Sequence, residues 1–301
     1  MSLMLIDSGS LWYRAFYGMP DTLVAPDGTP INAIRGYLDM TARLISMYRP
    51  NRLVACLDGD WRPSWRVDFY PDYKANRLEE EGDGQEDEPD LLTPQIPILL
   101  DVIEAFGIPI VGADDYEADD VMATYAVKEP GPIRIVTGDR DLFQLVNDDP
   151  DVQVIYLAKG ISQHDLVNRD WVAKRYEIPG DRYGLFATFR GDPSDGLPGV
   201  KGIGEKGAAL IARYFEDAQA AIAAAKSGDD RLTPALRKKI IEGEDYLSFA
   251  PKLVSCATDV PLPNINLQIP KKPGDLSEIM KYKEKYNLGA SIDRMISALN
   301  W

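Results

Sequence analysis

An acidic stretch that leads into an apolar helical pattern decides the fold, and it reads Gly112-Ala113-Asp114-Asp115-Tyr116-Glu117-Ala118-Asp119-Asp120-Val121. An apolar strand-like run, Ile108 to Val111, precedes it. A helix that begins near Tyr116 would bring Glu117, Asp119 and Asp120 to its first turn. The helix dipole alone also favours acids there, so capping and metal binding are both open for this stretch taken by itself.

Three other short apolar segments also end in aspartate. They are Leu3 to Ile6 before Asp7, Leu53 to Leu57 before Asp58, and Ile133 to Thr137 before Asp139 and Asp141. A buried parallel strand has such a sequence, and ligand sites in open α/β sheets lie beyond the carboxyl ends of the strands. Four strands would therefore bring their acids to one edge of one sheet. Asp139 and Asp141, two apart in an extended segment, would point to the same side.

The composition limits the chemistry that is available. The chain has 301 residues and an apolar content of 45%, enough for one large domain or two modest ones. No leader pattern and no apolar stretch of membrane-spanning length occurs, so a cytoplasmic location without a membrane partner is expected. Cys56 and Cys256 lie far apart among apolar neighbours, which favours buried reduced thiols. With His164 as the single histidine, chemistry is left to carboxylates, Lys, Arg and Tyr.

The net charge of −15 disfavours a nucleic-acid partner only if its distribution is ignored. Many acids lie in the strand-end set or in the tract Glu79 to Asp90, which has the composition of a solvated loop. The segment Trp61 to Arg77 interleaves aromatic rings with cations, as single-stranded nucleic acid requires. The alternative for its tryptophans is that they are buried in a core instead of binding nucleic acid. The segment from Tyr73 to Arg77 is too polar to contribute much to a core.

The repetition of strand, acidic end and helix favours a right-handed α/β sheet. Apolar periodicity predicts a helix over Leu91 to Phe106, stopped by Gly107, and a strand over Val152 to Leu157. A short helix is predicted over Leu142 to Val146, and the region from Asp165 to Phe189 is predicted to be helical.

A glycine-rich segment follows. Gly202-x-Gly204-x-x-Gly207 has the spacing of a dinucleotide-binding turn, but no strand precedes it. Two short helices joined by a Gly-Ile-Gly hairpin fit better, with the second helix starting near Glu205 and its free N–H groups available to a phosphate. Lys201 and Lys206 flank the hairpin, so it would hold one strand of a duplex without reading its sequence.

Three features around this segment complete the chain. Asp192-Pro193-Ser194-Asp195 can be a helix cap, or it can add acids to the strand-end set, and the other motifs favour the second alternative. A helix from Pro234 carries a second basic cluster. The amphipathic tail from Tyr282 to Trp301 is predicted to pack back on the first domain.

Seven segments in one order together resemble the bacterial and phage 5′ nuclease (flap endonuclease) family, which includes the 5′ nuclease domain of bacterial DNA polymerase I. They are Ile6-Asp7-Ser8, Tyr13-Arg14-Ala15-Phe16, Tyr73-Lys74-Ala75-Asn76-Arg77, Tyr116-Glu117-Ala118-Asp119-Asp120, Thr137-Gly138-Asp139-Arg140-Asp141-Leu142, Gly191-Asp192-Pro193-Ser194-Asp195 and Leu197-Pro198-Gly199-Val200-Lys201-Gly202-Ile203-Gly204-Glu205-Lys206. The likeness spans almost the whole chain, and the absence of a polymerase module after it makes the chain look like a stand-alone member.

The resemblance implies a PIN-like α/β nuclease domain over residues 1–185, with a helical arch or clamp at about 62–95. It implies a helix-three-turn-helix module of the helix-hairpin-helix type for duplex DNA over 186–260, and a C-terminal segment over 261–301. The implied activity is 5′–3′ exonuclease and flap endonuclease cleavage in replication primer removal and repair. The expected partner is DNA with 5′ ends, flaps or nicks, including RNA primers on DNA, and a monomer is expected.

The resemblance also assigns site residues. The implied metal-binding acids are Asp7, Asp58, Glu117, Asp119, Asp120, Asp139, Asp141, Asp192 and Asp195. The implied cations near the scissile phosphate are Lys74 and Arg77. The implied DNA contacts are Arg14, Arg66, Tyr73, Lys201, Gly202, Gly204 and Lys206. The backbone of Val200 and Ile203 in the hairpin is the implied site of a monovalent cation, potassium.

So many carboxylates in one place cannot all ionise without cations, because like charges raise one another's pKa. Oxygen ligands select hard ions, so two ions of Mg²⁺ or Mn²⁺, about 4 Å apart, are expected rather than zinc. Lys74 and Arg77 would stabilise charge on the transferring phosphoryl group. One ion is assigned mainly to Asp7, Asp58, Glu117 and Asp119, and the second mainly to Asp139, Asp141, Asp192 and Asp195, with Asp120 bridging through water.

Two features depart from the family pattern: Gly196 stands where relatives commonly have Asn, and the acidic insertion from Glu79 to Asp87 lengthens the arch. Two other classes of function compete. A non-catalytic binder of DNA structures would explain the hairpin and the basic clusters, but not the gathered acids. A metal-dependent phosphatase for small phosphoesters would explain the acids, but not the hairpin or the aromatic-basic segment.

Overall fold

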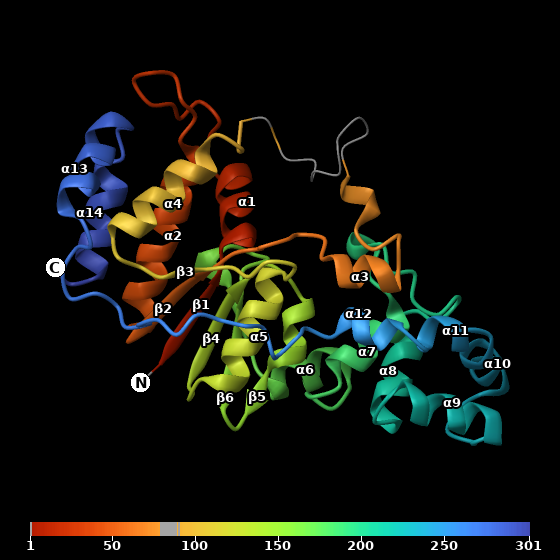
Figure 1. Ribbon diagram of the computed structural model, residues 1–301. Coiled ribbons are helices and arrows are strands. Elements are labelled where there is room, and N and C mark those ends of the chain that lie inside the picture. The colour runs from red at the N-terminus through yellow and green to blue at the C-terminus, as the bar shows by residue number, and fades with distance from the viewer. Residues whose placement is uncertain (1, 79–88, 90) are drawn as a thin grey trace.

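The computed structural model describes residues 2–78, 89 and 91–301 and is built around one sheet (Figure 1). Its parallel strands lie in the order β3-β2-β1-β4-β6. The bounds are Leu3–Asp7 for β1, Arg52–Cys56 for β2, Ile110–Val111 for β3, Ile133–Thr137 for β4 and Asp151–Tyr156 for β6. Two short strands, β5 (Asn147–Asp148) and β7 (Asp165–Val167), pair antiparallel with β6. The prediction of a parallel α/β sheet is confirmed.

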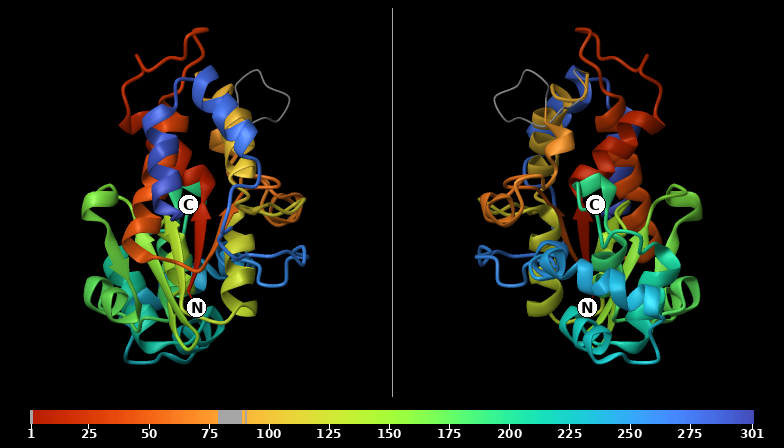
Figure 2. Two further views of the ribbon diagram at one scale, coloured as in Figure 1. Left: turned by 90° about the vertical axis from the view of Figure 1, so that its left-hand side faces the viewer. Right: turned by 90° about the vertical axis from the view of Figure 1, so that its right-hand side faces the viewer.

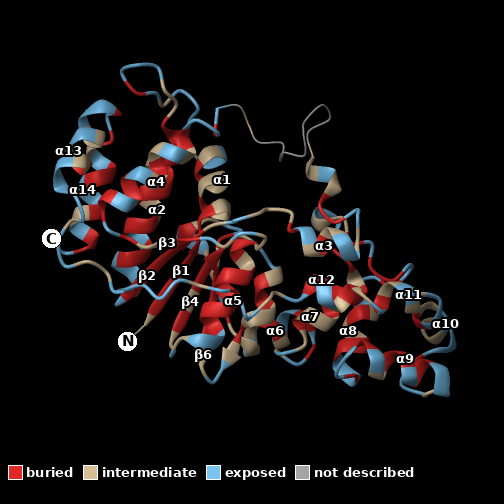
Figure 3. Ribbon diagram, in the orientation of Figure 1, coloured by how far each residue is buried: buried red, intermediate tan, exposed pale blue. Residues whose placement is uncertain are grey.

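Side chains alternate between two apolar cores on the two faces of the sheet, which explains the unbroken apolar sequence of its strands. The central strands are coloured as buried in Figure 3. In β1, Leu3 and Leu5 belong to one core, and Met4 and Ile6 to the other. Helices α1 (Ser8–Gly18), α2 (Asn32–Tyr48) and α4 (Gln95–Ala105) share the second core. Helix α5 (Ala118–Lys128) and the short 3₁₀ helix η2 (Asp141–Leu145) lie on the first.

The acidic stretch forms a turn before it forms the helix. Tyr116 N–H donates to Ala113 O at 3.1 Å, and Asp115 takes the left-handed conformation with φ +62°. Helix α5 therefore begins at Ala118, with Glu117 as its N-cap, rather than near Tyr116. The backbone N–H of Glu117 donates to Asp120 Oδ2 at 3.2 Å, so capping is part of this motif.

The region from Asp165 to Phe189 is not continuously helical, which corrects the prediction. It contains β7, then α6 (Arg169–Tyr176), and then α7 (Tyr183–Arg190). Glu177 ends α6 in the left-handed conformation, with φ +57°, and the Pro179-Gly180 pair prevents the helix from continuing.

The helical module beyond α7 contains α8 (Glu205–Tyr214), α9 (Ala218–Ser227), α10 (Pro234–Glu242), α11 (Glu244–Leu247) and α12 (Ala250–Val254). Helix α8 begins at Glu205 and α10 at Pro234, as predicted. Helix α8 packs on α7, and α10 packs on α9. The prediction of two short helices joined by the Gly-Ile-Gly hairpin is wrong for the first helix. Residues 196–204 contain no helix, and the element before them is the 3₁₀ helix η4 (Pro193–Asp195).

The chain then returns to the sheet (Figures 1 and 2). Helix α14 (Gly289–Ala298) packs on α2, and α13 (Leu276–Lys285) packs on α4. The Trp301 ring stacks on Phe106 with centroids 5.6 Å apart, and its indole N–H donates to Pro270 O at 2.8 Å. These contacts attach the tail to the helical layer on one face of the sheet.

Cys56 and Cys256 form no disulfide, and Cys56 is buried in β2. The acidic tract from Glu79 to Asp90 lies outside the described residues except for Pro89, and so does the whole of the predicted insertion from Glu79 to Asp87. Within the described ranges, no helix combines the length and apolar character that crossing a membrane requires.

Candidate active site

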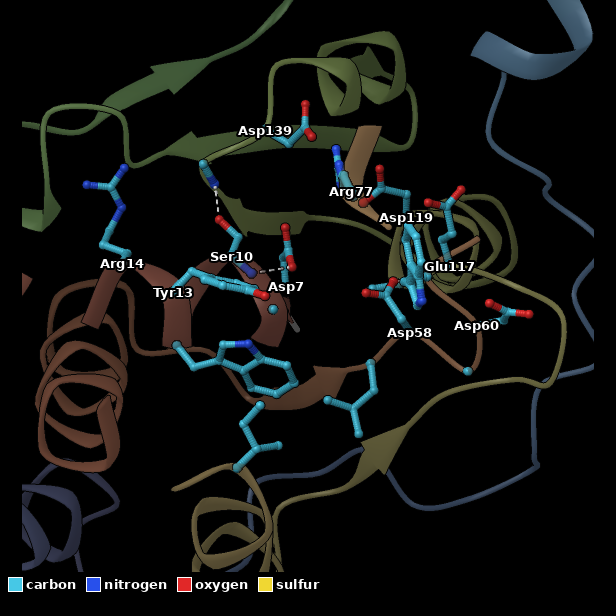
Figure 4. Close-up of a pocket in the computed structure, with 18 of the residues that line it drawn as sticks. Asp7, Ser10, Tyr13, Arg14, Asp58, Asp60, Arg77, Glu117, Asp119 and Asp139 are labelled. Carbon is cyan, nitrogen blue, oxygen red and sulfur yellow. Dashed lines mark hydrogen bonds between the residues drawn. The ribbon is translucent and has the colours of Figure 1, made fainter. Parts of the chain in front are cut away.

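A pocket of about 1100 Å³ opens at the carboxyl edge of the parallel strands (Figure 4). Four strand ends supply its acids, because parallel strands all end at the same edge of the sheet. Six of the nine predicted metal-binding acids line it: Asp7, Asp58, Glu117, Asp119, Asp139 and Asp195. Asp60 also lines the pocket and was not predicted, although it stands in the same Asp-Gly-Asp turn as Asp58.

A chain of hydrogen bonds joins the ends of β1 and β4. Asp7 Oδ1 accepts from Ser10 N at 3.0 Å, and Asp7 Oδ2 accepts from the Thr137 hydroxyl at 2.6 Å. The same hydroxyl accepts from Asp139 N at 2.9 Å, and Gly138 N donates to Ser10 Oγ at 2.7 Å. Asp7 and Asp139 are therefore held by the strand ends rather than by free loops.

The end of β2 is joined to α5 in the same manner. Asp58 Oδ1 accepts from Ala118 N, in the first turn of α5, at 2.7 Å. The turn around Gly59 lies against the Ala113 turn so closely that a Cβ atom on Gly59 would be 1.9 Å from Ala113 O. Glycine is needed here because of this close approach.

The pocket strongly disfavours negative charge on several of its acids. Burial raises the pKa of Asp7 to about 7 against the lowering effect of its hydrogen bonds from Thr137 and Ser10, and the charges of Asp58 and Asp139 add to the rise. Burial, with Asp139 and Asp7, also raises the pKa of Asp119 well above its ordinary value. These side chains compete for protons unless positive charge is supplied.

Two cations reach the acids from the segment that follows β2. The Lys74 ammonium is buried and contacts Glu117, and Arg77 Nη2 lies 2.8 Å from Asp195 Oδ1. Burial alone would raise the pKa of Glu117, but Lys74 and Arg66 outweigh it and the pKa is lowered. The backbone N–H of Lys74 donates to Asp195 O at 3.0 Å, so η1 (Ala75–Arg77) docks directly on η4.

The opposite wall of the pocket is aromatic and apolar, and the site residues assigned from the sequence did not include it. Trp12, Tyr13 and Tyr17 come from α1, and Ile96, Pro97 and Leu100 come from α4. Tyr17 is 74% exposed, which is unusual for a large ring. The available signal was the set of aromatic residues in the helix that directly follows Asp7.

Three predicted site residues lie beneath the pocket instead of in it. Asp120 is fully buried, and its two oxygens accept from the Arg66 guanidinium at 2.7 and 2.8 Å. Arg66 is 2% exposed and also contacts Glu117, while the Tyr73 hydroxyl donates to Glu117 Oε2 at 2.8 Å from a ring that is 3% exposed. This corrects the predictions that Asp120 bridges to the ions through water and that Arg66 and Tyr73 contact DNA, because both Asp120 oxygens are held by Arg66 and all three side chains are buried. Arg14, in contrast, lines the pocket from α1.

Asp141 and Asp192 lie beside the pocket without lining it. Asp141 begins η2, so the extended segment predicted for Asp139 and Asp141 is absent; the backbone N–H of Asp141 donates to Asp139 Oδ1 at 2.8 Å. Asp192 caps η4, since its Oδ1 accepts from Ser194 N at 2.9 Å. Burial, Asp139 and Asp192 together raise the pKa of Asp141, which shows that these carboxylates are neighbours.

The hairpin and the turn behind Asp195 depend on glycine. Lys201, Gly202, Gly204 and Lys206 are exposed, whereas the side chains of Val200 and Ile203 point into the core and the Ile203 N–H donates to Val200 O at 2.9 Å. Lys239 Nζ donates to Gly202 O at 2.7 Å. Gly196 has φ +71°, and a Cβ atom there would be 2.6 Å from Asp72 O. Asparagine could adopt this φ but not this close contact, which explains the departure at this position.

In the part of the chain that the structure describes, no three acids lie close enough together to hold an ion with protein ligands alone. A sheet edge that gathers carboxylates, beside a helical module with an exposed glycine hairpin, suits a nuclease, since the acids can bind the ions that hydrolyse a phosphodiester and the hairpin can bind a phosphate backbone. Comparison with known proteins identifies the family.

The family model "5'-3' exonuclease, N-terminal resolvase-like domain" matches residues 2–177, and "5'-3' exonuclease, C-terminal SAM fold" matches residues 178–275. The chain belongs to the 5′–3′ exonuclease family. A 5'-3' exonuclease of Streptomyces coelicolor is 47% identical over 98% of this chain and 99% of its own length. One of Mycobacterium tuberculosis is 42% identical, over 99% and 98%. The structure of a bacteriophage T5 flap endonuclease, in a pseudo-enzyme-product complex with DNA and metal ions, has a TM-score of 0.65 at 18% identity and covers both chains fully, at 100% each.

Proposed function

We propose that the protein is a structure-specific 5′ nuclease that hydrolyses DNA phosphodiesters with the help of two divalent ions, Mg²⁺ or Mn²⁺. The observation that carries the proposal is the convergence of six acids, Lys74 and Arg77 in one pocket at the carboxyl edge of the sheet. Both 5′–3′ exonuclease and flap endonuclease cleavage are included, since both need the same hydrolysis at phosphorus.

The donor set fits hard divalent ions. All the donors are carboxylate oxygens, and the raised pKa values of Asp7 and Asp119 show that the pocket needs added positive charge. Mg²⁺ keeps several waters and takes one or two carboxylates plus phosphate oxygens, so a set of acids spread along one wall suits it better than a closed cage.

The pocket suggests how its acids divide. Asp7, Asp58, Glu117 and Asp119 would hold one ion, partly through its bound waters, and Asp139 and Asp195, supported by Asp141 and Asp192, would hold the second in the same way. When bound, such ions activate a water and stabilise the leaving oxygen of an in-line displacement. Asp120 is left out of both sets because its oxygens are bonded to Arg66.

The remaining pocket residues would bind and orient the strand. Lys74 and Arg77 lie beside the acids and would exchange part of their contact with Glu117 and Asp195 for the phosphate. Trp12, Tyr13 and Tyr17 face them across the pocket, where bases of an unpaired strand can stack while its phosphate faces the acids. A frayed end or a flap meets this requirement, and an intact duplex does not.

The helical module, residues 186–260, would hold the duplex part of the substrate. Lys201 and Lys206 stand exposed beside the hairpin, and α8 begins directly after Gly204. This arrangement suits contact with one backbone of a duplex. A potassium ion on the carbonyls of Val200 and Ile203 remains part of the proposal. RNA primers on DNA, action in replication and repair, a monomeric state and a cytoplasmic location stay predictions.

The test is cleavage of a 5′-labelled flap duplex in Mg²⁺, Mn²⁺ or EDTA, with the size of the first product measured. We expect metal-dependent cleavage near the junction, abolished in Asp139→Ala while duplex binding persists. Binding without cleavage under every metal would favour a non-catalytic binder of DNA structures. Hydrolysis of nitrophenyl phosphate without cleavage of the flap would favour a phosphatase, and either result would refute the proposal.

A further inference from the structure

We propose that the segment from Val254 to Val260, here called the strap, couples duplex binding by the helical module to the positions of the pocket acids, with Gln144 as the positioning residue. The inference rests on the proposed nuclease function and deepens it. The side chains that hydrogen-bond the strap, Asp120, Thr124, Lys128 and Gln144, do not line the pocket themselves.

One stripe of helix α5 binds the strap backbone. Ala257 N donates to Asp120 Oδ1 at 2.7 Å. The Thr124 hydroxyl donates to Ala257 O at 3.3 Å and accepts from Val260 N at 3.2 Å, and Lys128 Nζ donates to Val260 O at 3.2 Å. Because Asp120, Thr124 and Lys128 follow one another at intervals of four, they lie on one face of the helix. The strap is thus bonded along the whole of α5.

Gln144 joins the strap to the second acid-bearing segment. Its Oε1 accepts from Cys256 N at 3.2 Å, and its Nε2 donates both to Val254 O and to Asp141 O at 2.9 Å. One side chain therefore bridges two residues of the strap and the first residue of η2. If this position served hydrophobic packing alone, it would not need a side-chain amide whose oxygen and nitrogen both form hydrogen bonds, as those of Gln144 do.

Both segments that the strap holds carry pocket acids. The first turn of α5 carries Asp119, and its N-cap is Glu117. Asp139 lies just before η2, and its Oδ1 accepts from Asp141 N. Asp120 adds a third connection, since it bonds the strap with one oxygen and Arg66 of α3 (Ser64–Phe69) with both.

Among the described residues, three connections lead from the helical module to the acid-bearing segments. Helix α7 packs on η2 and leads into η4 with Asp195, and the strap continues directly from α12, which packs on α7. A duplex held by the module therefore acts on the acids through α7, η4 and the strap. Misplacement of a reacting group by about 1 Å can lower a rate about 10²-fold, so small displacements of α5 or η2 matter.

The test compares flap substrates whose duplex arm is either long enough or too short to reach the hairpin. Binding is measured in EDTA by fluorescence anisotropy, and the single-turnover rate is measured in Mg²⁺ at saturating enzyme. We expect wild-type protein to cleave the long-arm substrate faster. Gln144→Met should bind both substrates within twofold of wild type, lose about 10-fold of the long-arm rate and keep the short-arm rate.

Thr124→Val is the matched control, because it removes two strap hydrogen bonds one turn farther from the pocket and leaves the strap bonded to Asp120 and Gln144. It should lower the unfolding temperature about as much as Gln144→Met and keep the long-arm advantage. Equal rate losses in the two variants, or a wild-type rate that does not depend on arm length, would overturn the coupling. Absence of wild-type cleavage would instead refute the proposed function.

A second measurement needs no variant. Hydrogen exchange of the wild-type protein in EDTA should slow at the amides of Cys256 and Ala257 when long-arm duplex binds, and should be unaffected by the short-arm substrate. Unchanged exchange at these two amides under saturating long-arm duplex would overturn the inference even if Gln144→Met failed to fold.

Discussion

Substitution of Arg66 by methionine should destabilise the protein by about 3–5 kcal/mol, the cost of leaving one side of a buried ion pair without its partner. The guanidinium makes hydrogen bonds to both oxygens of Asp120 and to Glu117, and it lies 4.3 Å from the Trp65 ring centre. Glu117 would retain Lys74 and the Tyr73 hydroxyl. Asp120 would retain only backbone donors, so most of the loss should arise from Asp120.

The assay is urea unfolding in EDTA at neutral pH, so that no ion can replace the lost charge. Asp120→Asn in the Arg66→Met background should recover at least about 1 kcal/mol, because it removes the stranded charge and leaves an oxygen to accept from Ala257 N. Arg66→Lys should be intermediate, since an ammonium cannot form the fork.

A DNA-contact role for Arg66 gives a different pattern. It predicts weaker duplex binding with little change in stability, whereas the buried pair predicts a large loss of stability with binding of the folded fraction within twofold. A cost below about 1 kcal/mol, or no recovery in the double variant, would refute the reasoning from burial.

Asp7→Asn should flatten the pH dependence of stability in the absence of metal. Burial holds the pKa of Asp7 at about 7 in the folded state, against an ordinary value of 3.8, so the folded state binds the proton more tightly than the unfolded state. Wild-type stability should therefore fall as the pH rises from about 4 to about 7. Over that window, the free energy of unfolding measured with urea in EDTA should become higher in the variant than in wild type, by at most about 4 kcal/mol. Parallel plots of this free energy against pH for the two proteins would contradict the prediction. Lys74→Ala should lower the single-turnover cleavage rate about 10²–10³-fold with duplex binding within threefold, and a loss confined to binding would argue against a role at the phosphate. Gly59→Ala should cost about 3 kcal/mol or more in thermal unfolding because its Cβ meets Ala113 O, while Gly18→Ala, where a Cβ meets nothing within 4 Å, should cost no stability.

The sheet and its acidic edge were predictable because their signals are local. An apolar run that ends in aspartate identifies both a buried strand and the residue that its end presents, and this holds at Asp7, Asp58 and Asp139. The start of α8 at Glu205 was predictable for the same reason, since the glycines of the hairpin cannot sit inside a helix without cost and Gly204 directly precedes the first helical residue.

The errors arose where a distant partner decides the role of a side chain. Asp120 has the same sequence context as Asp119, and only the Arg66 guanidinium, 54 positions earlier, removes it from the pocket. Tyr73 is in a polar segment, yet its ring is buried because η1 docks on η4. The aromatic wall was missed because Trp12 and Tyr17 contribute only after α1 and α4 are placed side by side.

The hydrogen bonds through Thr137 have a consequence for the spacing of the pocket acids. Adjacent parallel strands stand about 4.8 Å apart, a spacing that the backbone sets and side chains barely alter. Because the Thr137 hydroxyl donates to Asp7 and accepts from the backbone N–H of Asp139, it ties the residues that follow two neighbouring strands to that spacing. Evolutionary change in the surrounding loops can then reshape the mouth of the pocket, while the sheet keeps the backbone of these two acids in register.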